Sequence, residues 1–538
     1  MALFNLAQSA VPVVRARAPV CIVGGGFAGL LVAHRLVQLG QNVIVLESGG
    51  ETTAEWTDKL SEIDDPSGRY VRSVTGRSRG LGGTSVKWSG RMLPITRHDA
   101  GPRPYLDLPG WPFHLEELEA YRTEIETLFS VGHETYEEEL LDMVGLTRDF
   151  LRRDADFAPR WPKWPSFHNC NIANVLGREI RYSTKIEVWL GATVCAYELD
   201  RESGRIESIQ AGDLGGRRLR VQADHVVFAA GTIETTRLLL LLDRHSGGRA
   251  FEGCDALGCY FQDHLDADVG MIRPINSAAQ QRLFSHRFVG STRRSLHLEL
   301  TPAAQKADCV GSAFASVQMN FAGSAEMEIL KRFLRGLQRN AFDINLKEAL
   351  RLAQHSNLLA QLAFGKLARK QIYVPASVDR RIHVCVEQLP SKENKITLSD
   401  QIDAFGMSKV RLAWSPTERE EKTFQSVVRR LAHYWVRSGF DLTCPIEWAD
   451  RDRGRRIVDR AEDFAHPSGS TRMGLDKRHS VVGPDLYCWH VRDVSVVSAS
   501  TFPTAGSANP TLTLMLLALR AADSISSRVM QTNDRPNG

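Results

Sequence analysis

The first fifty residues alternate between short apolar runs and an apolar stripe at helical spacing. Residues 20–23 form an apolar run of the length of a short buried strand. After a glycine-rich turn, apolar residues recur on one helix face: Leu30, Leu31, Ala33, Leu36 and Val37. Residues 42–46, apolar from Val43 on, predict a second strand. The order strand, turn, helix, strand is typical of a parallel α/β unit.

Similar patterns recur far along the chain. Apolar runs predict strands at 188–199, 206–209, 223–230 and 494–498, and a short strand and turn at 481–485. Helical spacing predicts helices at 111–131, 232–242 and 510–525. Alternating residues predict antiparallel strands at 295–300 and 381–387, with a helical block at about 325–370 between them. The segment 159–165 is rich in proline and aromatic residues and predicts a loop.

The turn after the first strand carries the first chemical signal. Gly24, Gly26 and Gly29 form the pattern G-x-G-x-x-G, which permits a tight turn, close approach of a pyrophosphate and close helix packing. The N-terminus of the helix that follows offers free N–H groups to phosphates. Glu47 lies 18 residues after Gly29, where a carboxylate is expected to meet a ribose hydroxyl. These residues predict a dinucleotide site, because a turn that serves only packing leaves Glu47 unexplained.

Two further regions favour a ligand. Residues 80–91, GLGGTSVKWSGR, form a glycine-rich loop whose backbone amides suit an anion or a flat ring, with Lys87 and Trp88 as its wall. Near the C-terminus, HPSGSTRMG begins at His466 and SANPTLT ends at residue 513. Asn509 and Pro510 suit the N-cap and first turn of a helix, whose positive end would face a cofactor.

Composition narrows the function classes. With 538 residues the chain is too long for one ordinary core, so we expect two domains. A net charge of +4 is small for this length and does not suggest a nucleic-acid partner. Nine scattered cysteines without a C-x-x-C pair favour a reducing, cytoplasmic location, and we expect no metal site. We also expect no signal peptide and no transmembrane segment.

The block 331–370 is basic, with nine lysines and arginines against Asp343 and Glu348. A solvated helical face is the simpler interpretation of this block. A site for a membrane surface or an acidic partner is the alternative.

Taken together, the motifs resemble the glucose–methanol–choline (GMC) family of FAD-dependent oxidoreductases. The resemblance covers the glycine motif with Glu47, residues 80–91, 229–240 and 466–525. SANPTLT and residues 387–399 look closest to the pyranose-oxidase and polyol-dehydrogenase-like branch.

The resemblance implies an α/β fold, α+β overall. A Rossmann-like, doubly wound FAD-binding domain would be assembled from residues 1–95, 180–264 and 456–538. A substrate domain with an antiparallel sheet and helices would comprise residues 96–179 and 265–455. Substrate choice is expected to lie in residues 265–380, which match the family only loosely.

The resemblance also implies which residues contact FAD. They are Gly24, Gly26, Phe27, Ala28, Gly29, Glu47, Ser48, Gly82, Gly83, Thr84, Ser85, Trp88, Val194, Ala230, Gly231, Pro510 and Thr511. Covalently flavinylated proteins of the branch carry a histidine where this chain has Lys87, so we expect non-covalent FAD. Ser498 stands where members of the family frequently have an aspartate, so the flavin contact of that aspartate is not predicted for this chain.

The family's working pair falls on His466 and Asn509. An imidazole can accept a hydroxyl proton at neutral pH, and an amide can orient the hydroxyl without competing for that proton. His264 is a rival base, and helix capping alone is the alternative role of Asn509.

The implied activity is oxidation of an alcohol to a carbonyl, with hydride transfer to flavin N5. We expect the alcohol to belong to a sugar, glycoside or polyol. The electron acceptor would be oxygen, a quinone or a redox protein, and a homo-oligomer is possible. The alternatives are a nicotinamide-dependent flavin monooxygenase, although we see no second dinucleotide motif, or a redox-silent flavoprotein that is lyase-like or a structural subunit.

Overall fold

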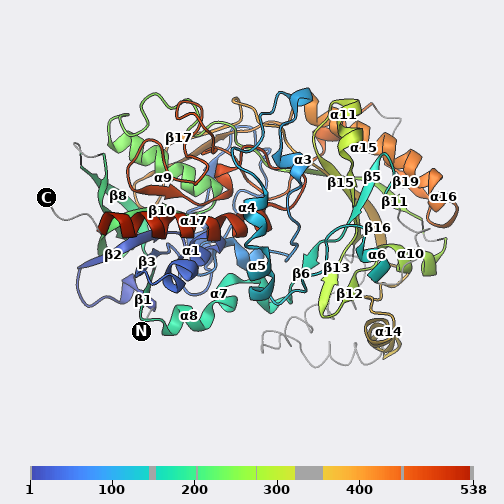
Figure 1. Ribbon diagram of the computed structural model, residues 1–538, viewed down its shortest axis with the longest axis horizontal. Helices are drawn as coiled ribbons and strands as arrows, with labels where there is room; N and C mark the ends of the chain where they lie inside the picture. The colour runs from blue at the N-terminus through green and yellow to red at the C-terminus, as the bar shows by residue number, and fades with distance from the viewer. Residues whose placement is uncertain are drawn as a thin grey trace.

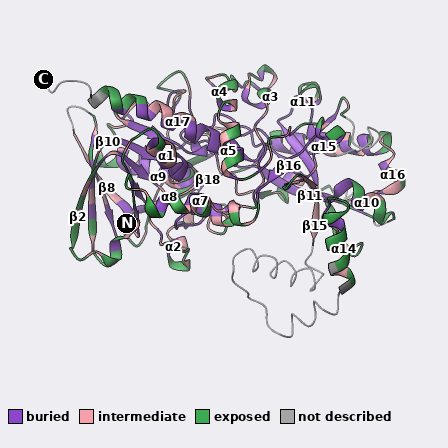
Figure 2. Ribbon diagram, turned by 60° about the horizontal axis from the view of Figure 1, so that its bottom comes forward, coloured by how far each residue is buried: buried purple, intermediate pink, exposed green. Residues whose placement is uncertain are grey.

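The computed structural model describes residues 3–143, 153–200, 204–273, 275–320, 356–449 and 454–533. Two large sheets lie toward opposite ends of its long axis (Figure 1). In Figure 2, buried residues fill the interior of both halves.

The first sheet contains eight described strands. They are β1 (Leu3–Asn5), β2 (Val13–Val23), β3 (Val43–Leu46), β7 (Ile186–Leu190), β8 (Thr193–Leu199), β9 (Ile206–Gly212), β10 (Arg218–Phe228) and β21 (Val494–Val496). Their order is β1-β7-β3-β2-β10-β9-β8, and β21 pairs with β10. The pairs from β1 to β10 are parallel, as is β10–β21, whereas β9 is antiparallel to β8 and β10.

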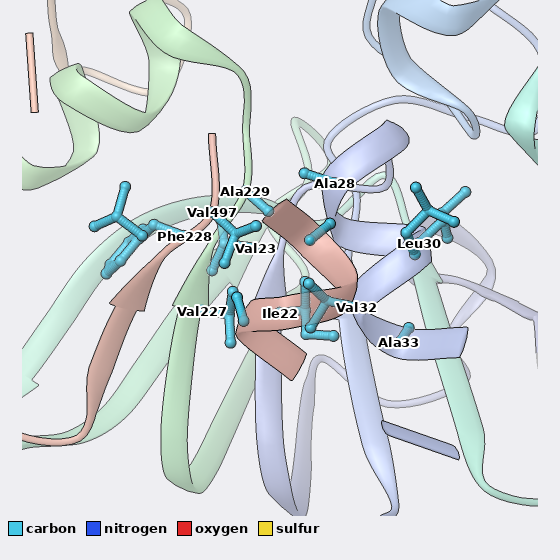
Figure 3. Packing of buried hydrophobic residues seen from close by; sticks show 14 of the residues in the cluster. Ile22, Val23, Ala28, Leu30, Val32, Ala33, Val227, Phe228, Ala229 and Val497 are labelled. Atoms are coloured by element: carbon cyan, nitrogen blue, oxygen red, sulfur yellow. The ribbon is translucent and has the colours of Figure 1, made fainter. Parts of the chain in front are cut away.

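Three helices complete the core around this sheet. α1 (Phe27–Gln38) follows β2 and contacts α17 (Pro510–Asn533), while α9 (Thr232–His245) follows β10. Their buried apolar side chains join those of the strands in one cluster. Figure 3 shows Ile22, Val23, Val227 and Phe228 of the strands near Ala28 of α1. Because β2 and β10 are parallel neighbours, the turns that follow them meet at one edge of the sheet.

The second sheet is antiparallel. Its strands are β5 (Phe157–Arg160), β11 (Leu265–Ile272), β14 (His297–Leu300), β15 (Ala313–Asn320), β16 (Asp379–Val386), β19 (Ile446–Trp448) and β20 (Glu462–Asp463). Helix α15 (Glu418–Arg437) packs against β15 and β16 and begins with a capping box formed by Thr417 and Glu420. A second apolar cluster lies between this helix and the sheet. The predicted fold class, α/β with α+β overall, is confirmed.

Shorter elements connect and cover the sheets. The helices are α2 (Glu55–Lys59), α3 (Arg97–Ala100), α4 (Glu116–Glu119), α5 (Arg122–Leu128), α6 (Leu140–Met143), α7 (Ile172–Val175), α8 (Gly177–Tyr182), α10 (Ser277–Phe284), α11 (Pro302–Asp308), α14 (Ser356–Leu367) and α16 (Phe440–Thr443). The strands are β4 (Ile63–Asp64), β6 (Lys163–Trp164), β12 (Arg287–Val289), β13 (Thr292–Arg294), β17 (Lys395–Ile402) and β18 (Ser408–Ala413).

Several element predictions were wrong. The single helix expected at 111–131 is split into α4 and α5. It also starts late, because Trp111 donates its backbone N–H to Ala100 and its indole N–H to Thr504. The strand expected at 188–199 is broken at Gly191, whose φ of 63° makes a turn between β7 and β8.

Three further segments differ from expectation. Residues 159–165, expected as a loop, contribute to β5 and β6; Pro159 is tolerated because β5 is the edge strand of its sheet. Residues 481–485 form no regular strand, since Val482 makes only isolated bridges. Strand β2 begins at Val13 rather than residue 20, because its first half alternates between exposed and less exposed residues beside β10.

Most of the basic block 331–370 lies outside the described residues; α14 belongs to its described part, and several of its residues are exposed (Figure 2). Within the described ranges, no helix combines the length and the apolar character that crossing a bilayer requires.

The strands of the first sheet fall inside the expected FAD-binding segments. Those of the second fall inside the substrate segments, except β20. The exact division of the chain into domains remains our proposal.

Candidate active site

A cavity of about 460 Å³ lies where the turns after β2 and β10 meet the start of α17. This volume is typical of small-molecule sites. The predicted site residues that line it are Gly24, Gly26, Phe27, Ala28, Glu47, Ser48, Gly83, Thr84, Trp88, Val194, Ala230, Gly231, His466, Asn509, Pro510 and Thr511. Segments that are hundreds of residues apart therefore converge on one space.

Gly29, Gly82 and Ser85 stand behind this wall. A Cβ atom on Gly29 would lie 1.9 Å from the carbonyl oxygen of Gly24, so this glycine permits helix packing. The Ser85 hydroxyl donates to the carbonyl of Gly82 over 2.6 Å and accepts the N–H of Ile172 over 3.1 Å. Gly29 and Ser85 hold the lining residues in place rather than forming the surface themselves.

The glycine turn leaves room and donors for an anionic ligand. Gly24 has a φ of 111°, and a Cβ atom there would lie 2.6 Å from the carbonyl oxygen of Ala229. Gly26 is the N-cap of α1 and contributes no side-chain capping bond, so the first N–H groups of the helix are free of such a cap. This arrangement fits a diphosphate at the helix N-terminus.

Glu47 links three loops beside this turn. Its carboxylate accepts N–H groups from Gly25 over 2.8 Å, Gly49 over 2.8 Å and Gly80 over 3.0 Å. Burial raises the pKa of Glu47, and the three hydrogen bonds oppose that shift. The residue lines the cavity, and its contact with a ribose hydroxyl remains a prediction.

Two histidines and an amide form a hydrogen-bonded chain at the other end of the cavity. Nδ1 of His264 lies 2.9 Å from Nδ1 of His466, and Nε2 of His264 lies 2.7 Å from the carbonyl oxygen of Gly506. Nε2 of His466 lies 3.1 Å from Nδ2 of Asn509. His466 and Asn509 line the cavity, whereas His264 is fully buried behind them.

The partners of this chain determine where its protons lie. A carbonyl oxygen can only accept, so His264 donates from Nε2 to Gly506. Burial lowers the pKa of His264, which is therefore neutral, and its Nδ1 accepts a hydrogen bond. His466 must then donate from Nδ1. Its Nε2 is left with a lone pair that faces Asn509 and the cavity.

His466 is also held through its backbone. Asp263 accepts the N–H of His466 over 2.8 Å and the hydroxyl of Tyr70 over 2.7 Å. Ala465, which precedes His466, has a φ of 54°, a strained conformation for a residue other than glycine. Burial lowers the pKa of His466 well below its usual value, and the nearby His264 and Arg91 add to this effect. The imidazole is therefore a neutral base at physiological pH.

The sequence of this chain was compared with a family model and with known proteins. Residues 390–518 match the family model for GMC oxidoreductases. Along 96% of its length, the chain is 24% identical to 2-methyl-1,2-propanediol dehydrogenase of Mycolicibacterium austroafricanum, with 96% of that protein covered. It is also 24% identical to the fructose dehydrogenase large subunit of Gluconobacter japonicus, over 96% of this chain and 98% of the relative.

Residues 390–518 thus match the GMC oxidoreductase family, and the whole chain is similar to the two dehydrogenases. Its fold agrees with pyridoxine 4-oxidase from Mesorbium loti, a solved structure with a TM-score of 0.57 and 14% identity that covers 94% of this chain and 99% of the other. GMC oxidoreductases bind FAD, and the glycine turn and Glu47 described above fit the diphosphate and ribose of that cofactor. The predicted resemblance to the GMC family is confirmed over residues 390–518, and the predicted FAD cofactor agrees with that match.

The side chain of Asn509 makes no capping hydrogen bond, although α17 begins at the next residue. Its Oδ1 atom is buried and has no hydrogen-bond partner among the described residues, so it accepts no N–H group from α17. The interpretation of Asn509 as a pure cap was therefore wrong. The reason is that Nδ2 is directed to His466, a contact between positions 43 residues apart. The free carbonyl oxygen remains available next to Nε2 of His466.

Two further residues at this site, His264 and Arg91, have positions that the sequence did not predict. His264 was considered as a rival base, but it supports His466 from behind and does not line the cavity. Arg91, the last residue of the loop 80–91, lines the cavity and had no assigned role. Only its position at the end of a ligand-facing loop could have signalled it.

Lys87 and Ser498, the two residues that depart from the family pattern, both line the cavity. Lys87 lines the cavity, but its Nζ atom donates to the carbonyl of Arg77 and lies 3.3 Å from Asp58. Ser498 also lines the cavity, and its hydroxyl accepts the N–H of Ser500 over 3.2 Å.

Proposed function

We propose that this protein oxidises an alcohol group of a sugar, glycoside or polyol to a carbonyl, with His466 as the base. The observation that carries the proposal is the chain from Gly506 through His264 to His466, which leaves Nε2 of His466 unprotonated in the cavity. The names of the relatives give a diol and fructose as their substrates, which supports an alcohol on a polyol or sugar.

The residues divide the proton chemistry between them. FAD, when bound, supplies the hydride acceptor. Nε2 of His466 takes the hydroxyl proton. The Nδ1–H of His466 remains hydrogen-bonded to His264, and this bond fixes the orientation of the His466 ring. Asn509 can pair with His466 in either state, since Nδ2 donates to neutral Nε2 and the free Oδ1 can accept from protonated Nε2. The substrate carbon thus loses a hydride and its oxygen loses a proton.

Anaerobic mixing of the yellow protein with sugars, glycosides and polyols tests the proposal. Bleaching of the flavin by an alcohol supports it. Bleaching only by NADH or NADPH would favour the monooxygenase, and a flavin that no compound bleaches would favour a redox-silent protein.

Several finer points belong to the same proposal. We propose non-covalent FAD, because Lys87 occupies the place of a flavinylated histidine; acid precipitation should then release all the colour. A cytoplasmic location is supported by nine free cysteines. The acceptor, whether oxygen, a quinone or a redox protein, and a homo-oligomeric state also remain proposals.

A further inference from the structure

Arg91 is a cation of the active-site cavity without a counter-ion in the part of the chain that the structure describes. Its Nε and Nη1 atoms are buried and have no hydrogen-bond partner. The guanidinium lies 5.2 Å from the ring centre of Trp164 and 6.0 Å from that of Phe314. Burial and the nearby Arg293 lower the pKa of Arg91 to about 10, which still leaves it charged at neutral pH.

The surroundings of Arg91 add donors and no negative charge. Arg293 lies 4.5 Å from the Trp164 ring centre, and its Nε atom is also buried without a partner. Among the described residues, neither ring nitrogen of the buried His297 has a hydrogen-bond partner, and Nδ1 of His286 has none either. Burial holds the pKa of His286 near 3, so that ring is neutral. Two guanidinium groups are therefore gathered beside the cavity with no carboxylate among the described residues bonded to Arg91.

Three buried arginines of this chain have the carboxylate partners that Arg91 lacks among the described residues. Arg103 is bound by both carboxylate oxygens of Glu387, at 2.6 and 2.7 Å. Arg160 lies 2.8 Å from Glu299, and Arg237 is paired with Glu234 and Asp403. A buried cation that lacks such a partner costs free energy, because its lost hydration is not replaced. Arg91 differs from these three in that it lines the catalytic cavity.

We propose that the substrate of this enzyme is an alcohol that carries an oxyanion group, a carboxylate or a phosphate ester, and that Arg91 binds this group. The inference rests on the proposed function, because it places the anion in the same cavity as His466. A planar guanidinium matches either group with two parallel hydrogen bonds. Trp164 and Phe314 back the cation, and the oxyanion supplies the counter-charge that the described residues lack.

Matched alcohols test this proposal through anaerobic flavin reduction. The two sets are glycerol, glycerate and glycerol 3-phosphate, and D-glucose, D-glucuronate and D-glucose 6-phosphate. We expect an anionic member to reach half-maximal reduction at a concentration at least tenfold below that of its neutral counterpart. Comparison of the carboxylates with the phosphates identifies the anion. A neutral member that performs as well as both anionic members in both sets would overturn the proposal.

Variants connect the preference to Arg91. Arg91→Met should abolish the preference for the anion, whereas Arg91→Lys should retain part of it. Arg478→Gln, which changes an exposed arginine paired with Asp255, is the control and should leave the preference unchanged. A preference that survives in Arg91→Met contradicts the proposal, as does loss of bound FAD in that variant, which would assign Arg91 to the cofactor.

Two further measurements test the role of Arg91 without an oxidisable alcohol. If no alcohol reduces the flavin, the proposed function fails, but these measurements still decide whether Arg91 binds an anion. Acetate, benzoate and inorganic phosphate are added in turn to the wild type and to Arg91→Met. At least one of these anions should change the flavin absorbance of the wild type and leave that of Arg91→Met unchanged. The Arg91→Met variant should also unfold at the same denaturant concentration as the wild type or at a higher one, whereas Arg103→Met should unfold earlier. Absence of any anion response, or a loss of stability in Arg91→Met that matches Arg103→Met, would overturn the proposal.

Discussion

The two ends of the cavity differ in how their polar groups are satisfied. At the glycine-motif end, the Glu47 carboxylate accepts three backbone N–H groups. At the histidine end, Oδ1 of Asn509 and two nitrogens of Arg91 are buried without partners among the described residues. Buried polar atoms are rarely left unpaired in proteins, and unpaired ones require an explanation. The Glu47 carboxylate is thus satisfied by the chain itself, whereas we propose that a ligand satisfies the unpaired atoms of the histidine end.

The comparison also separates two kinds of contribution to activity. Residues of the glycine-motif end should affect FAD binding and stability, because their contacts are internal. Residues of the histidine end should affect the reaction and leave FAD bound. The following substitutions test this division, beginning with the largest expected effect.

His466→Ala should slow anaerobic flavin reduction by about 10²–10⁴-fold, which is the usual contribution of general base catalysis. FAD content should be unchanged, because the internal contacts of His466 are with His264, Asn509 and Asp263. Stopped-flow absorbance measures the rate, and extraction of the flavin measures the content. Reduction at the wild-type rate would show that another group is the base.

His264→Phe should have a smaller effect on the same step. It removes the acceptor of the His466 Nδ1–H, a loss of about 1–3 kcal/mol for a buried hydrogen bond, or roughly one to two orders of magnitude in rate. His264→Gln is the control, since its side chain can accept from His466 and donate to Gly506. If Gln does not restore more rate than Phe, the positioning role of His264 is wrong.

Glu47→Ala should weaken FAD binding by about 1–3 kcal/mol, the cost of a lost hydrogen bond at a buried site. The stability of the FAD-free protein should fall too, because three backbone N–H groups lose their acceptor. Titration with FAD and denaturant unfolding measure the two effects. An unchanged FAD affinity would remove Glu47 from the cofactor site.

Asn509→Ala should have the smallest effect on stability. Since Oδ1 accepts no hydrogen bond from α17, the free energy of unfolding should fall by less than the ~1 kcal/mol that a lost N-cap usually costs. Flavin reduction should still be slower, although less than in His466→Ala. A full capping loss with an unchanged rate would restore the interpretation of Asn509 as a cap.

The same comparison explains what the sequence could predict. The segment 20–46 was predicted closely, because strand, glycine turn and helix depend on contacts within thirty positions, although β2 begins earlier, at Val13. His466 and Asn509 were identified through the resemblance to the family, and the structure brings them together.

Long-range contacts account for what was missed. The contact between His264 and His466 joins residues 202 positions apart, and no local pattern signals it. Arg91 meets Trp164 and Phe314 only after three separate segments have folded together. The late start of the helix expected at 111–131 depends in part on the bond from Trp111 to Thr504, which spans 393 positions.

The pH dependence of anaerobic flavin reduction tests most directly whether neutral His466 accepts the substrate proton. Burial lowers the pKa of His466, so the base is neutral above that value and its contribution is lost as the pH falls through it. The wild-type rate should therefore stay level to below pH ~6.5, the ordinary value for histidine, and decline only in more acid solution. The decline should be absent in His466→Ala. A decline with the same midpoint in both proteins would contradict the account.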